Sequence, residues 1–121
     1  MKICVTSQGE GLDAQVDPRF GRCPYFILVE TDTMDFEAVQ NPNVTGMGGV
    51  GVQSGQLMSE KQVKAVLTGN VGPNAFRTLQ AAGIDIITGV SGSVKEAVDK
   101  YKSGEVKPAD DPNVDSKFGM G

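Results

Sequence analysis

Short runs of β-branched and aromatic residues, each bounded by turn residues, predict the strands of this chain. KICVTS and YFILVE have this composition, and DFEAVQ follows the polar TDTM as the return arm of a hairpin near an edge. KAVLTG and IDIITG are continuous apolar runs, which are typical of parallel strands buried on both faces. The predicted strands are residues 2–7, 25–30, 35–40, 64–69 and 84–89.

Helical patterns alternate with the later strands, at residues 52–62, 73–83 and 93–104. In the last of these, apolar residues recur at spacings of three and four, and Gly104 follows as a stop signal. The middle segment begins with a proline and ends at a glycine, as helices commonly do. The first carries an imperfect apolar stripe that Gly55 weakens.

The element order β-β-β-α-β-α-β-α predicts an α/β domain with a mixed five-stranded sheet. An antiparallel meander joins parallel strands, and right-handed crossovers place helices on both faces of the sheet. A chain of 121 residues is long enough for one such domain, which we expect at residues 1–104. Residues 105–121 are polar, interrupted by proline and without periodicity, so we expect a loosely ordered tail.

Composition and charge exclude several classes of function. The net charge of −4 argues against a nucleic-acid binder, and no apolar run is long enough for a membrane span. Without a signal segment, the expected location is cytoplasmic. Histidine is absent, which removes Ser-His-Asp and Cys-His catalysis and the commonest zinc sites. With no paired nucleophile and base, we expect a binding protein and not an enzyme.

The predicted topology brings three glycine-containing loops to one edge of the sheet, and each loop leads into a helix. They are NPNVTGMGGVG, TGNVGPN and TGVSGS, at residues 41–51, 68–74 and 88–93. Helix N-termini present free N–H groups and a partial positive charge, and glycine lets the backbone approach a ligand. Ligands of open α/β sheets lie at this edge. These loops therefore predict an anion site.

The long loop between the first two strands adds positive charge to the same edge. PRFGRCP, at residues 18–24, contains Arg19, Arg22 and Cys23. Arg22 and the helix N-termini are expected to lower the pKa of the Cys23 thiol and to favour the thiolate, the form that bonds metals.

Simpler interpretations of these residues stay open. Gly69 and the other glycines after strands often only form turns. An alternative for the two arginines is that they are solvated loop charges paired with Asp13 or Asp17. Cys4, inside a strand, is expected to be a small buried hydrophobe, and Cys23 is a ligand or an inert loop cysteine.

The glycine-rich segment GMGGVGVQ does not fit a nucleotide motif. Residues 46–51 match G-x-G-x-x-G, but no acidic residue follows in the region 66–71, and the segment does not follow the first strand of a βαβ unit. Val52 stands where a P-loop requires lysine. Four glycines exceed what one tight turn needs, so close approach of a ligand is the better explanation for them.

Four blocks in this order resemble a known family: MKI-V-S at the start, D-P-RFGRCPYF (17–26), GMGGVGVQ before a helix, and AVLTGNVGPNAF (65–76). They resemble the dinitrogenase iron–molybdenum cofactor biosynthesis family of NifX-type proteins and NifB-type C-terminal domains. The resemblance covers residues 1–104. It implies a ribonuclease-H-like three-layer fold, and binding or carriage of an iron–sulfur or iron–molybdenum type cluster. Cluster donor or acceptor proteins are the implied partners.

These observations combine in one hypothesis: GMGGVGVQ and PRFGRCP face each other across a crevice and hold an anionic metal cluster. Glycine N–H groups and Gln53 contact the cluster, the arginines offset its charge, and Cys23 is the metal ligand. A single thiolate suits a transient carrier, because resident iron–sulfur clusters usually have four. The candidate residues are Arg19, Arg22, Cys23, Gly46, Gly48, Gly49, Gly51, Gln53, Gly69 and Asn70.

Two other classes of function use the same features. One is a small-anion or nucleotide-binding regulatory module at the same glycine-rich edge, and the other is a protein–protein adaptor. We expect a monomer or a weak homo-oligomer, with neither nucleic acid nor membrane as a partner.

Overall fold

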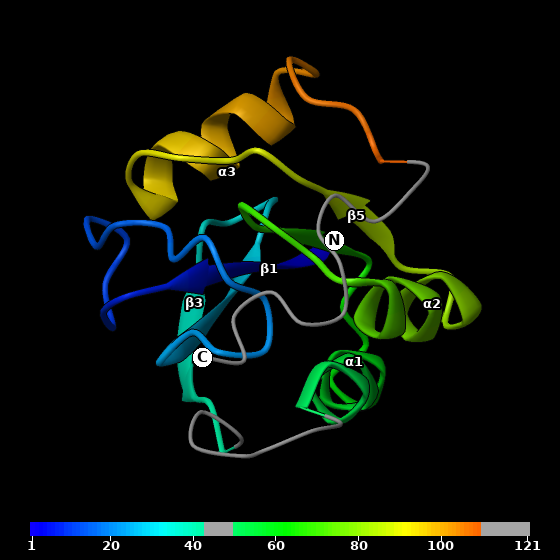
Figure 1. Cartoon of the computed structure of the whole chain (residues 1–121). Helices are drawn as coiled ribbons and strands as arrows, with labels where there is room; N and C mark the ends of the chain where they lie inside the picture. The colour runs from blue at the N-terminus through cyan, green and yellow to red at the C-terminus, as the bar shows by residue number, and fades with distance from the viewer. Residues whose placement is uncertain (43–49, 110–121) are drawn as a thin grey trace.

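The computed structural model describes residues 1–42 and 50–109. Its strands are β1 (Lys2–Ser7), β2 (Tyr25–Glu30), β3 (Phe36–Gln40), β4 (Ala65–Leu67) and β5 (Asp85–Ile87), and its helices are α1 (Val50–Glu60), α2 (Pro73–Ala81) and α3 (Val94–Lys102). The strands form one mixed sheet in the order β3-β2-β1-β4-β5, with the helices packed on it (Figure 1).

Strand β1 lies at the centre of the sheet and sets the register of its neighbours. It pairs antiparallel with β2, where Ser7 faces Tyr25, and parallel with β4, where Val5 faces Leu67. Tyr25 in turn faces Gln40 of β3, and β5 runs parallel to β4. The carboxyl ends of β1, β3, β4 and β5 therefore lie at one edge of the sheet, which we call the carboxyl edge.

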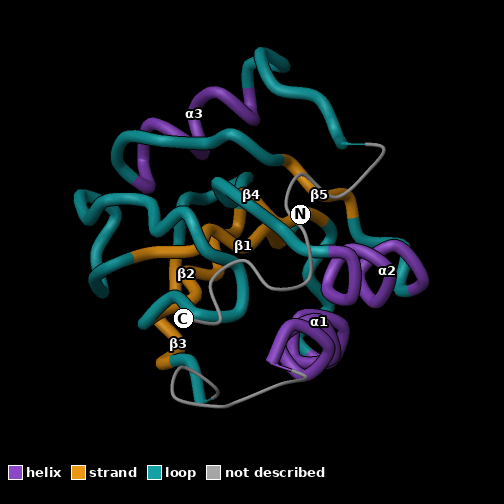
Figure 2. Tube along the Cα trace, viewed as in Figure 1, coloured by secondary structure: helices purple, strands orange, loops and turns teal. Residues whose placement is uncertain are grey.

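Helices cover both faces of the sheet, with α1 and α2 on one side and α3 on the other (Figure 2). Alternate side chains of β1 supply both interfaces. Cys4 belongs to the core beneath α1 and α2, with Met58 and Leu79, whereas Ile3 and Val5 belong to the core beneath α3. Because both faces are covered, the central strands are nearly continuous apolar runs in the sequence.

Gly55 lets α1 pack closely against α2. A Cβ at this position would lie 2.7 Å from the Cγ2 of Thr78 and 3.8 Å from the Cγ of Leu79, both on α2. Glycine lowers the helix propensity of α1. The close crossing of the two helices explains why a glycine stands there nevertheless.

The predicted elements are confirmed, with differences at their ends. β4 and β5 are shorter than predicted, and α1 begins at Val50, two residues earlier than predicted. Gly51 therefore belongs to the first turn of α1 and not to the loop before it. The mixed five-stranded sheet with helices on both faces is confirmed as well.

The described part of the predicted tail runs beside β5. The backbone N–H of Ala109 donates to the carbonyl of Ile86 at 2.6 Å, and Val106 packs against the core beneath α3. Residues 110–121 lie outside the described residues, so the order of the tail as a whole stays a prediction.

The helices are short. The longest helix among the described residues, α1, has 11 residues, whereas a transmembrane helix needs about 20. Within residues 1–42 and 50–109, no helix has the length and apolar character that a membrane crossing requires.

Candidate functional site at the carboxyl edge

The loop after β1 folds back over the carboxyl edge and is held there by hydrogen bonds. The N–H of Asp17 donates to the carbonyl of Thr6 at 2.9 Å, and the Thr6 hydroxyl donates to the carbonyl of Asp17 at 2.6 Å. The Thr6 hydroxyl also lies 2.9 Å from that of Thr68, which follows β4. All three residues are buried. The segment that follows, residues 17–24, is called the arginine loop below.

Asp17 orients Arg19 at the start of the arginine loop. Its carboxylate is only 2% exposed, and it accepts the backbone N–H of Arg19 at 2.9 Å and the side-chain Nε at 3.4 Å. The Arg19 side chain itself is 45% exposed. Pairing with Asp17, one of the alternatives left open by the sequence, is therefore confirmed for Arg19. A guanidinium has five N–H donors, so this pairing leaves donors for an anion.

The arginine loop lies against the loop that follows β4. Asn70 donates its N–H to the carbonyl of Pro18 at 2.6 Å and accepts the N–H of Phe20 at 3.2 Å, which forms a parallel bridge between Arg19 and Asn70. The structure thus brings together three of the candidate residues, Arg19, Gly69 and Asn70.

Gly69 is required by this close approach and not by a turn. A Cβ at this position would lie 2.7 Å from the Cα and 3.0 Å from the carbonyl oxygen of Pro18. Backbone atoms cannot yield as the end of a flexible side chain can. Gly69 therefore serves to join the two loops, a role that neither the turn nor the ligand-approach interpretation included.

Asn41, which directly follows β3, holds the second half of the arginine loop. Its side-chain amide donates to the carbonyls of Gly21 at 3.0 Å and Cys23 at 2.9 Å, and its backbone N–H donates to the carbonyl of Pro24 at 2.9 Å. Asn41 is 2% exposed. Sequence reasoning missed this residue, because an asparagine after a strand carries no signal of a partner 18 or 20 positions earlier.

The pKa of the Cys23 thiol differs from the predicted one. The side chain of Cys23 is fully buried in the core beneath α1 and α2, in the same cluster as Cys4. Burial raises the pKa of the Cys23 thiol to about 12, and the negative charge of Asp17 adds to the rise. The predicted lowering of its pKa by Arg22 and the helix N-termini is wrong, because desolvation of the thiolate outweighs those charges. Cys4 is buried as predicted.

The glycine-rich segment lies mostly outside the described residues, and so do Gly46, Gly48 and Gly49. Gly51 lies in the first turn of α1, and the side chain of Gln53 is exposed on the same helix. The crevice expected between this segment and the arginine loop thus stays a prediction.

The helix N-termini that follow β4 and β5 differ in their donors. At α2, Gly72 is the N-cap and provides no side-chain hydrogen bond. At α3, Ser93 accepts the N–H of Glu96 and Glu96 accepts the N–H of Ser93, which forms a capping box. Of the two, only α2 has first-turn N–H groups without a side-chain cap.

A resident metal centre of protein ligands does not fit these residues. Within the part of the chain that the structure describes, no three His, Cys, Asp or Glu side chains come together so that they could hold a metal ion. The donors at the carboxyl edge are guanidinium and backbone N–H groups, which suit an anion.

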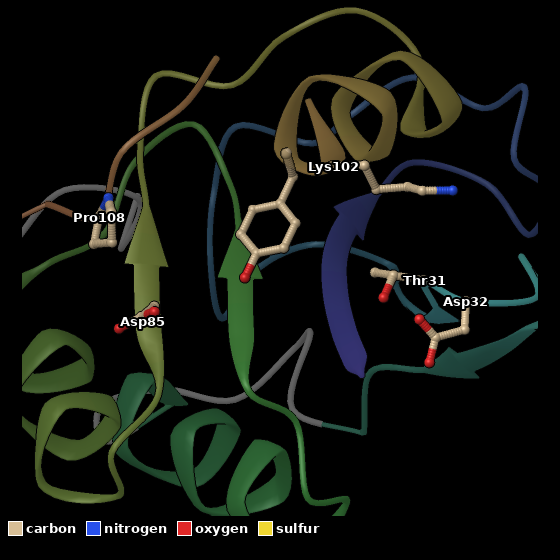
Figure 3. A pocket seen from close by; sticks show the side chains of 6 residues that line it. Thr31, Asp32, Asp85, Lys102 and Pro108 are labelled. Atoms are coloured by element: carbon tan, nitrogen blue, oxygen red, sulfur yellow. The ribbon is translucent and has the colours of Figure 1, made fainter. Parts of the chain in front are cut away.

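A hollow of about 460 Å³ lies at the opposite edge of the sheet. Asp32 and Asp85 stand on either side of it, and Lys102 reaches over it from the end of α3 (Figure 3). Thr31, Tyr101 and Pro108 complete its lining. Among the described residues, none of the candidate site residues predicted from the sequence lines this hollow.

The family model described as dinitrogenase iron-molybdenum cofactor matches residues 1–104. The chain belongs to this family. A relative in Methanocaldococcus jannaschii, an uncharacterized protein, is 30% identical over 96 residues, which are 77% of this chain and 81% of the relative.

Solved structures of similar proteins agree with this family and with the fold. The apo form of the orange protein from Desulfovibrio gigas is 41% identical, with a TM-score of 0.91 over 93% of this chain and 96% of the other. A Thermotoga protein described as a candidate NifB protein is 34% identical, with a TM-score of 0.77 over 88% of this chain and 91% of the other.

Proposed function

We propose that this protein binds an anionic metal cluster, of the iron–sulfur or iron–molybdenum type, as cargo at the carboxyl edge. The bridge between Arg19 and Asn70 is the observation that carries the proposal, because it joins the arginine loop to the loop leading into the uncapped N-terminus of α2. Membership of the dinitrogenase iron-molybdenum cofactor family supports this class of cargo. The protein carries the cluster from a donor protein to an acceptor protein.

Charge and backbone N–H groups hold the cargo in this proposal. Arg19 and Arg22 offset its negative charge, and the segment with Gly46, Gly48 and Gly49 adds N–H groups to its sulfides. Gly51 and Gln53, in the first turns of α1, complete the contact. Contacts of this kind release a cargo more readily than metal–thiolate bonds do, which suits a carrier.

Cys23 as the direct metal ligand is a separate part of the proposal. Its sulfur is fully buried and its pKa is raised to about 12, so a metal bond requires the arginine loop to open and expose the thiol. Binding through the arginines needs no such movement. The two modes therefore predict different behaviour of a Cys23→Ser variant.

The protein acts without catalysis in this scheme, in line with a family that handles a cofactor. Its partners are the proteins that make or receive the cluster. The ribonuclease-H-like label for the fold is proposed on the resemblance of the sequence, and the strand order supports it. Such a fold does not imply nuclease activity.

The test is anaerobic incubation with a source of iron–sulfur or iron–molybdenum clusters, followed by desalting, absorbance and metal analysis. Wild type is compared with Arg19→Gln, Arg22→Gln and a charge-matched control, Lys102→Gln, which lies at the opposite edge. We expect each arginine variant to bind about tenfold more weakly, and the control to bind like wild type. Colourless, metal-free wild type would overturn the proposal.

Two further samples separate the binding modes and the classes of function. Cys23→Ser binds like wild type if the arginines hold the cluster, and loses metal if the sulfur is a ligand. Titration with ATP, phosphate and sulfate tests the small-anion alternative, whose binding is colourless and indifferent to Cys23.

A further inference from the structure

The buried side chain of Asn41 forms hydrogen bonds with the backbone on both sides of Arg22. The amide of Asn41 donates from a single nitrogen, Nδ2, to the carbonyls of Gly21 and Cys23, the residues immediately before and after Arg22. The backbone N–H of Asn41 donates to the next carbonyl, that of Pro24. Three of the four carbonyls of residues 21–24 thus accept hydrogen bonds from one residue.

This arrangement restricts the direction in which the side chain of Arg22 leaves the backbone. Gly21 has a φ of +96°, a left-handed conformation that favours glycine and that turns the chain just before Arg22. These two hydrogen bonds hold the peptide plane between Gly21 and Arg22 and the peptide plane between Cys23 and Pro24. Only the four backbone dihedrals of Arg22 and Cys23 separate the two planes, and the Cys23 side chain is itself fixed in the core, so the direction of the Cα–Cβ bond of Arg22 is restricted.

The burial of Asn41 makes this control rigid. The residue is 2% exposed, and a buried carbonyl that loses its donor cannot be satisfied by bulk water. Alternative conformations of residues 21–24 would break both hydrogen bonds from the amide of Asn41 together. These hydrogen bonds therefore favour one conformation of the loop before any ligand binds.

We propose that Asn41 is the positioning residue for Arg22, which it holds ready for the anionic cargo. The inference rests on the proposed function for the identity of the cargo. It adds that the anion site is built before binding, by a residue that follows β3 and contacts the arginine loop through its backbone carbonyls. Asn41 acts on the cargo only through Arg22.

A double-mutant cycle tests this relation. The variants are Asn41→Ala, Arg22→Gln and the pair, titrated anaerobically with a synthetic thiolate-ligated [4Fe–4S] dianion well below the unfolding temperature of each. We expect Asn41→Ala to weaken binding about tenfold in wild type, and hardly at all when Arg22 is already glutamine. An equal loss in both backgrounds, or no loss in wild type, would contradict the inference.

Two controls separate positioning from lost stability. Val98→Ala removes buried volume beneath α3, on the other face of the sheet, and is expected to lower the unfolding temperature without changing the affinity. Asn41→Asp keeps the size of the side chain but replaces donors by a carboxylate facing two carbonyls. It should bind no better than Asn41→Ala, and wild-type affinity in this variant would refute the role of the amide donors.

Amide hydrogen exchange of residues 21–23 decides the positioning role independently of the cargo. We expect Asn41→Ala to speed this exchange, and Val98→Ala to leave it unchanged. If wild type binds no cluster, the proposed function fails while the exchange still tests the inference. Unchanged exchange in Asn41→Ala would overturn the inference even if wild type binds the cluster.

Discussion

Helices α2 and α3 begin in nearly the same way and make opposite use of their N-termini. Their N-cap residues, Gly72 and Ser93, have similar extended backbones, with φ of −84° and −81°. Ser93 and Glu96 satisfy N–H groups of α3 within the chain, whereas Gly72 has no side chain to do so for α2.

The loops before these helices show the same contrast. Gly69, before α2, has no room for a Cβ because Pro18 of the arginine loop lies against it, whereas Gly89, before α3, has open space and a φ of +73°. The loop before α2 packs against another loop, and the N-terminus of α2 has no side-chain cap. The N-terminus of α3 is capped by side chains of its own first turn. Similar glycine-containing exits therefore do not have equal potential for binding.

The largest effect is expected from an alanine at Gly69. Gly69→Ala should cost about 3 kcal/mol in the free energy of unfolding, since the new Cβ meets the backbone of Pro18. It should also abolish cluster binding. Gly89→Ala should cost only about 1 kcal/mol, for its left-handed backbone. Chemical denaturation of both variants measures the difference, and equal costs would show that the two exits are alike.

Removal of the α3 cap should have a smaller effect on stability and should leave cluster binding unchanged. Ser93→Ala loses the side-chain acceptor of the capping box and should cost about 1 kcal/mol in stability. Because this terminus is assigned no role in binding, cluster affinity should not change. A parallel loss of affinity would mean that the α3 terminus belongs to the site.

A cap introduced at α2 should raise the stability of the protein and lower its affinity for the cluster. Gly72→Ser supplies an acceptor for the first-turn N–H groups and should stabilise the protein by about 0.3 kcal/mol. The same donors are then no longer available to the cargo, so affinity should fall about threefold, within the range of helix-terminus contacts. Calorimetry and cluster titration of one sample give both values, and unchanged affinity would remove α2 from the site.

The smallest effect is a pH dependence confined to α3. The N–H of Ser93 donates to the carboxylate of Glu96 and lowers the pKa of that group below its ordinary value of 4.5. Its contribution to stability is therefore complete above pH 4.5 and is lost as the pH falls through the lowered pKa. Amide exchange of α3 across this range should show fraying in wild type but not in Glu96→Gln, whose amide is not titrated. Equal pH dependence in both would assign the effect to another group.

Local patterns were sufficient for most of the fold. The five strands and three helices were predicted because apolar spacing follows from the period of each element and from which faces are covered. The capping box of α3 was also present in the sequence as S-x-x-E at Ser93 and Glu96, a signal that the prediction did not use. Ends of elements were less certain, as the earlier start of α1 shows.

The site depended on contacts between distant segments. That the loops of Arg19 and Asn70 share the carboxyl edge followed from the topology, whereas the bridge between the two residues was seen only in the structure. The burial of Cys23 and its raised pKa could not be predicted in this way. In the sequence Cys23 is a loop cysteine beside an arginine, and only the structure shows that its side chain enters the core.

The sequence by itself determined the order of elements, the covered faces of the sheet and the family, because each depends on residues close together along the chain. Tertiary structure alone decided that Gly69 must be a glycine and that Asn41 holds the arginine loop. Both roles depend on backbone atoms of segments far away in the sequence. Carbonyl and Cα atoms are the same in every residue type. The sequence of a segment therefore does not indicate which distant residue will contact its backbone.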